Sequence, residues 1–80
     1  MRSCFVVFTD PGRVMQGMHR TVDGATVAAV SCGAARMPDG SDVTIDAVAK
    51  LLRNAPSVSF ACHEWEDAET AHIERHPILL

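Results

Sequence analysis

The stretch that decides the fold runs from Ser57 to Trp65 and reads SVSFACHEW. Its larger apolar residues, Val58, Phe60 and Cys62, alternate with small or polar ones: Ser57, Ser59, Ala61 and His63. A period of two is typical of a β-strand that buries one face and exposes the other. We therefore predict a strand over residues 57–65 with the side chain of Phe60 in the hydrophobic core.

The segment before this strand has the pattern of an amphipathic helix over residues 44–54. Its apolar residues recur at helical spacing, and Asp42 or Thr44 is the candidate N-cap. Asp46 lies in the first turn and Arg53 in the last, which is the favourable order for the helix dipole. We expect this helix to pack across one face of a sheet.

The N-terminal run from Cys4 to Thr9, CFVVFT, is apolar on both faces and predicts an interior strand. Two interpretations compete for the segment after it. Asp10-Pro11-Gly12 is either a turn that leads into a second strand over residues 13–22, or the start of a helix with Met15 and Met18 on one face. Glycines at two positions disfavour the helix, so we favour the strand.

Asp23-Gly24 predicts a hairpin turn, because both central residues of such a turn take positive φ. Residues 25–32, ATVAAVSC, would then be the returning strand of an N-terminal meander. The segment from Gly33 to Asp42 contains Pro38-Asp39-Gly40 and is predicted to be a loop.

The C-terminal segment from Glu66 to Arg75, EDAETAHIER, is predicted to be a short helix. Its acidic residues lie at the N-terminal end, where they match the helix dipole, and Pro77 would end it. Together these elements predict one α+β domain over residues 1–80: a small antiparallel sheet packed by the helix over residues 44–54.

Composition sets limits on function. The chain has 80 residues and a net charge of −3, which argues against direct binding to nucleic acid and permits a basic protein partner. Its cysteines, Cys4, Cys32 and Cys62, are odd in number and far apart, so we expect buried thiols in a reducing cytoplasm. No signal peptide or apolar run of membrane-spanning length is evident, and we expect no membrane association.

Cys62, His63, His72 and His76 are candidates for a metal or thiol site. His72 and His76 are four residues apart and would share one face of a helix. However, His76 precedes a proline, where helical backbone is disfavoured, and neighbouring residues of a strand face opposite sides. We therefore predict no metal, no cofactor and no catalytic residue. A small metal-binding protein or enzyme that uses these four residues is the alternative.

The acidic residues near the C-terminus are the stronger functional feature. Trp65 is the only tryptophan and lies among carboxylates, an arrangement typical of a protein-binding hot spot. The alternative is that Trp65 caps the edge of the core. We predict a partner-binding patch that consists of Glu64, Trp65, Glu66, Asp67, Glu69 and Glu74.

In size, acidity and lack of catalytic motifs, the chain resembles the small inhibitors that phages and mobile elements encode, among them the anti-CRISPR proteins. The resemblance implies a non-catalytic inhibitor that binds a subunit of a nucleic-acid-binding complex in the host cytoplasm. Clustered carboxylates can occupy a basic surface that normally handles nucleic acid. An antitoxin-like dimerising domain is a further alternative, so the chain is expected to be a monomer or a homodimer.

Overall fold

The computed structural model describes residues 2–10, 12–62 and 70–78. Two helices and five strands occur in these ranges. They follow in the order β1 (Arg2–Asp10), β2 (Val14–His19), α1 (Val22–Ser31), β3 (Ala34–Arg36), α2 (Ile45–Asn54), β4 (Ser57–Cys62) and β5 (Thr70–Ile78). None of the described helices is long and apolar enough to cross a membrane.

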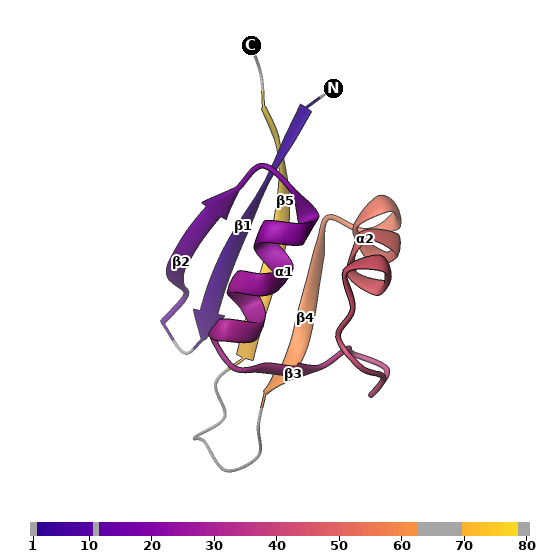
Figure 1. The fold of residues 1–80 in the computed structure, drawn as a ribbon. Coiled ribbons are helices and arrows are strands. Elements are labelled where there is room, and N and C mark those ends of the chain that lie inside the picture. Colours follow the sequence, from indigo (N-terminus) through magenta and orange to yellow (C-terminus); the bar gives the residue numbers. More distant parts are fainter. Residues whose placement is uncertain (1, 11, 63–69, 79–80) are drawn as a thin grey trace.

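The strands form one antiparallel sheet in the order β2-β1-β5-β4-β3, which curls as a half-barrel around α1 (Figure 1). β5 lies in the middle and pairs with β1 along its whole length, from Asp10 opposite Thr70 to Arg2 opposite Ile78. β1 and β5 are therefore neighbours, and the start of β1 lies beside the end of β5 (Figure 1).

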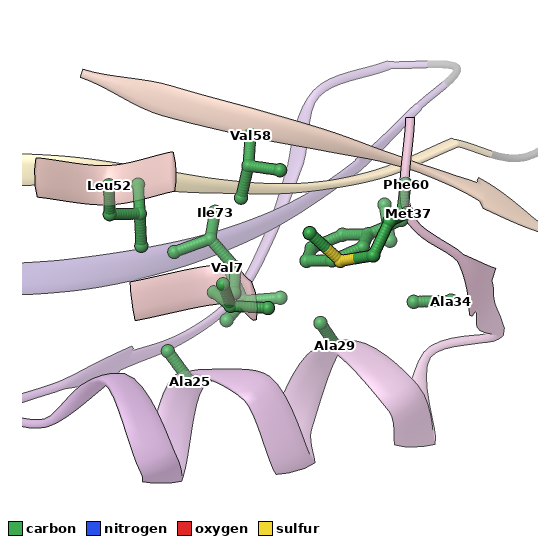
Figure 2. Close-up of a cluster of buried hydrophobic side chains, with 11 residues drawn as sticks. Val7, Ala25, Ala29, Ala34, Met37, Leu52, Val58, Phe60 and Ile73 are labelled. Atoms are coloured by element: carbon green, nitrogen blue, oxygen red, sulfur yellow. The ribbon is translucent and has the colours of Figure 1, made fainter. Parts of the chain in front are cut away.

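Both helices pack on the same face of the sheet, and no described element covers the other face. The core between the helices and the sheet contains Phe60, Ile73, Val7 and Val48, each with 1 % or less of its surface exposed. Figure 2 shows the side chains of Ala25 and Ala29 directed from α1 toward this cluster. Their small size lets the helix lie close to the sheet, where larger residues of the strands fill the space.

Several predicted elements are confirmed. β1 covers the predicted strand over residues 4–9 and is paired on both sides. The predicted strand over residues 13–22 is confirmed in its central part, since β2 spans Val14–His19 and Val22 already belongs to α1. Gly12 takes a φ of +95° before β2, while Pro11 lies outside the described residues. α2 begins after Thr44, whose hydroxyl accepts a hydrogen bond from the N–H of Ala47 at 3.1 Å. In β4, Val58 and Phe60 are buried and Ser57 and Ser59 are exposed, as the alternation predicts, while residues 63–65 of the predicted strand lie outside the described ranges.

The predicted hairpin at Asp23-Gly24 is wrong, because these residues form the first turn of α1. Thr21 is the N-cap, and its hydroxyl accepts a hydrogen bond from the N–H of Gly24 at 3.1 Å. Asp23 then lies in the first turn, where its charge favours the helix dipole. Glycine has a packing role here: a Cβ at position 24 would lie 3.2 Å from Nδ1 of His19.

The predicted strand over residues 25–32 is therefore also wrong. Ala25 and Ala29 are fully buried while Val27 between them is 62 % exposed, which is the spacing of a helix and not of a strand. The apolar residues of α1 are spread around the helix and form no distinct stripe, so hydrophobic periodicity gave no helical signal. The predicted loop over residues 33–42 is correct except for the short strand β3.

The predicted C-terminal helix is wrong as well, since residues 70–78 form β5 and residues 66–69 lie outside the described ranges. Ala71 and Ile73 are fully buried, and His72 and Glu74, which alternate with them along the strand, point to the opposite face. β5 pairs with strands on both sides, and this pairing outweighs the helix propensities of its residues, which differ by less than about 1 kcal/mol each. The sheet is thus larger than predicted.

Candidate functional site on the open sheet face

The uncovered face of the sheet carries an ordered set of polar side chains. Alternation along β5 places His72, Glu74 and His76 on this face, opposite to the buried Ala71 and Ile73. The same alternation in β4 places Ser57 and Ser59 beside them. We call this surface the open face.

At its centre, three side chains from three adjacent strands are joined by hydrogen bonds. The Oγ of Ser59 lies 2.7 Å from Nδ1 of His72, its direct cross-strand neighbour. The Nε2 of His72 lies 2.6 Å from Oδ2 of Asp10 at the end of β1. Asp10 is itself held in place, because its Oδ1 accepts a hydrogen bond from the backbone N–H of Arg13 at 3.1 Å.

These contacts fix the tautomer of the imidazole. An ionised carboxylate only accepts hydrogen bonds, so Nε2 of His72 must carry the proton that is shared with Asp10. In the neutral ring, Nδ1 then has a free lone pair and accepts the hydroxyl proton of Ser59. The arrangement of hydroxyl, imidazole and carboxylate resembles a nucleophile, its base and the group that orients the base.

A second network lies next to the first. The guanidinium of Arg13 bonds both carboxylate oxygens of Glu74, at 2.7 and 2.8 Å, and it stacks 4.2 Å from the centre of the Phe8 ring. The imidazole of His76 also contacts Glu74, with Nε2 at 3.0 Å from Oε1. The hydrogen bonds from Arg13 hold the pKa of the Glu74 carboxyl below its usual range, and the contact with His76 adds to this effect.

Apolar side chains lie beside these networks. Met15 and Met18 of β2 are 59 % and 64 % exposed, and their register partners on β1 are Phe8 and Val6. Met37, by contrast, is buried in the core. Exposed methionines at a sheet surface are adaptable contact groups, because the thioether side chain is unbranched and polarizable.

Hollows lined by described residues lie on two parts of the surface. One of about 250 Å³ lies at the end of the open face and is lined by Pro56, Ser57, Glu74, Arg75 and His76. The other, of about 320 Å³, lies beside α2, between Lys50, Leu51 and the turn from Met37 to Ser41. The first is next to the hydrogen-bonded networks, so the open face has both ordered polar groups and a recess.

Most of the predicted partner-binding patch lies outside the described residues: Glu64, Trp65, Glu66, Asp67 and Glu69. Its remaining member, Glu74, lies on the open face, where Arg13 and His76 share its carboxylate. In sequence, residues 63–69 join β4 to β5, the two strands that carry Ser59 and His72. The assignment of the patch as a binding surface stays a prediction.

The residues of the alternative metal site are not gathered in the described part of the chain. His72 uses both ring nitrogens in hydrogen bonds, and His76 contacts Glu74. Cys62 is a half-buried free thiol, as are Cys4 and Cys32, which corrects the expectation that all three thiols are buried. His63 lies outside the described ranges. Among the described residues, no three His, Cys, Asp or Glu side chains are close enough to hold a metal ion.

Sequence reasoning missed the link between Asp10, Ser59 and His72. The sequence placed His72 with Cys62, His63 and His76 in an alternative metal or enzyme site, on a helix that is in fact β5. The alternation of polar His72 and Glu74 with apolar Ala71 and Ile73 is the signal that could have identified a strand with a polar face. The register between β4 and β5, which places Ser59 opposite His72, has no signature in the sequence.

Comparison with known proteins gives no relative: no family model matches the chain, and no curated protein or solved structure is significantly similar to it. The fold and the open face are therefore the basis for any functional assignment. They define a small α+β domain in which the two described helices cover one face of a curled antiparallel sheet.

Proposed function

We propose that this chain is a non-catalytic protein-binding inhibitor that occupies a basic, nucleic-acid-handling surface of a partner complex, as anti-CRISPR proteins do. One observation carries the proposal: no described element covers the open face of the sheet, and the sequence between two of its strands is acidic. The strands β4 and β5 contribute to the open face, and the residues that join them in sequence include four carboxylates and the only tryptophan. An uncovered sheet face can bind a protein partner, and a segment rich in carboxylates favours a partner with positive charge.

The proposed contact residues are those of the predicted partner-binding patch, whose carboxylates we call the acidic patch. Carboxylates attract a cationic surface over several ångströms and accelerate association, and a tryptophan can supply a large apolar anchor. Exposed Met15 and Met18 provide adaptable apolar contacts on the same molecule. Glu74 would take part by exchanging the guanidinium of Arg13 for a cation of the partner. The contact set is Glu64, Trp65, Glu66, Asp67, Glu69 and Glu74.

The proposal is tested by affinity capture with the tagged chain from a bacterial lysate at low and at high salt. We expect a nucleic-acid-binding complex to be captured at low salt and released at high salt, because attraction between exposed charges is screened. Added DNA or RNA should compete with the chain for the captured complex. If neither salt nor nucleic acid changes the amount of complex captured, the chain does not occupy a basic nucleic-acid-binding surface through its charge.

Neutralisation of the acidic patch separates specific contacts from overall charge. The test variant replaces Glu64, Glu66 and Glu69 with Gln and Asp67 with Asn. A matched control gains the same net charge through lysines at exposed positions of the two helices and their ends: Val27, Val30, Ser31 and Asn54. We expect the test variant to lose the partner and the control to retain it. If both variants lose the partner equally, net charge and not the acidic patch determines binding.

A further inference from the structure

We propose that Ser59 is an activated nucleophile that accepts an acyl group from activated esters, with His72 as its base and Asp10 as the group that orients His72. This site goes beyond the proposed binding function and needs no turnover. Its basis is the continuous chain of hydrogen bonds from the Ser59 hydroxyl through the His72 ring to the Asp10 carboxylate, at 2.7 and 2.6 Å.

The accessibility of the three groups fits this role. Ser59 is exposed, so an ester can reach its hydroxyl from the solvent side. The His72 side chain is only 21 % exposed and lies on the central strand of the sheet, which fixes the direction of its ring. The Asp10 side chain is 46 % exposed, and its second oxygen is held by the turn between β1 and β2. A rigid base beside an accessible nucleophile is the arrangement that nucleophilic catalysis needs.

Acyl transfer from an aryl ester to Ser59 needs no further reactant. The oxygen of Ser59 attacks the carbonyl carbon of an aryl ester, and its proton passes to Nδ1 of His72. The tetrahedral intermediate collapses with loss of the phenoxide, which takes the proton from His72 and leaves as the phenol. The products are O-acyl-Ser59 and one phenol for each ester consumed. Asp10 keeps its charge throughout and stabilises the imidazolium that forms.

The same geometry limits the kind of donor. The network supplies a nucleophile and a base, and its hydrogen bonds include no donor aimed at a developing oxyanion. Oxyanion stabilisation is usually the largest single contribution to acyl transfer, so unactivated esters and amides should be inert. The recess beside Ser57, two residues along β4 from Ser59, can accommodate a small acyl or aryl group.

The experiment uses p-nitrophenyl acetate and the intact chain, with the acetyl group located by peptide mass spectrometry. Ser57 is an internal control, because it lies on the same face of β4, is also exposed and has Glu74 rather than a histidine opposite. We expect acetylation at Ser59 to exceed that at Ser57 by about 10²-fold or more, the usual effect of a positioned base. Equal labelling of the two serines overturns the proposal.

Two variants test the roles of the other groups in folded protein. His72→Gln should reduce acetylation of Ser59 to the level of Ser57, while the amine of Lys50 is acetylated at an unchanged rate. Asp10→Asn should also reduce acetylation of Ser59. The amide can donate a hydrogen bond to Nε2 of His72 and so favour the tautomer in which Nδ1 carries the proton and cannot act as the base. The ring ¹⁵N chemical shifts of His72 report this change of tautomer, which a purely structural role of Asp10 would not predict. Acetylation of Ser59 that survives His72→Gln would overturn the assignment of the base.

Discussion

Phe60 is the largest fully buried side chain among the described residues. It is 1 % exposed and lies in the cluster that joins the sheet to both helices (Figure 2). The substitution Phe60→Ala removes the ring and leaves a cavity, which costs about 3–5 kcal/mol in comparable cores. Met37 belongs to the same cluster, and its flexible side chain can move into part of the space. We therefore expect a loss near the lower end, about 3–4 kcal/mol.

The loss expected for Phe60→Ala is a large part of the total free energy of unfolding. A chain of 80 residues has a free energy of unfolding of about 4–12 kcal/mol at the usual stability per residue. Urea unfolding followed by circular dichroism gives the difference directly. With a slope of about 1 kcal/mol per molar urea, the midpoint should fall by about 3 M, or the variant should be unfolded without urea. Ser57→Ala, on the exposed face of the same strand, is the control and should change stability by less than about 0.5 kcal/mol. A loss below about 1 kcal/mol for Phe60→Ala would refute the assignment of the buried face of β4.

Two further predictions concern the helix cap and the ion pair. Thr21→Ala removes the hydroxyl that accepts from the N–H of Gly24, so we expect a loss of about 1 kcal/mol in urea unfolding, whereas Thr21→Ser should restore most of it; no loss would contradict the cap of α1. The Glu74 carboxyl has a lower pKa in the folded chain than in the unfolded one, so its contribution to stability is present above about pH 4.3 and is lost as the pH falls through the folded pKa. The difference in stability between the natural chain and Glu74→Gln should therefore be larger at pH 7 than at pH 3, and Arg13→Gln should reduce this pH dependence; a difference that is independent of pH would exclude the ion pair as its source.

The sequence by itself determined the elements in which a local pattern is strong. The alternation in SVSFACHEW gave the strand and its buried face, and the spacing, cap and charge order of residues 44–54 gave α2. The apolar run CFVVFT gave an interior strand. In each case the residues that become buried carry the period of the element, so the signal does not depend on the rest of the chain.

Tertiary structure decided the elements whose local signals are weak or misleading. Residues 22–31 have no distinct apolar stripe, and the packing of Ala25 and Ala29 against the sheet selects the helix that the Thr21 cap begins. Residues 70–78 contain good helix formers, yet they become the central strand because β1 and β4 offer hydrogen-bonding partners on both sides. Such pairing is non-local, and no short window of sequence contains it.

The same reason explains the candidate site. Asp10, Ser59 and His72 are separated by up to 62 residues and meet only because β1, β5 and β4 are neighbours in register. The sequence indicated that Ser59 lies on the outward face of its strand, which the structure confirms. It could not indicate that a histidine lies opposite, because the register of β4 against β5 is set by the burial of Phe60 with Ala71 and of Val58 with Ile73 in one common core.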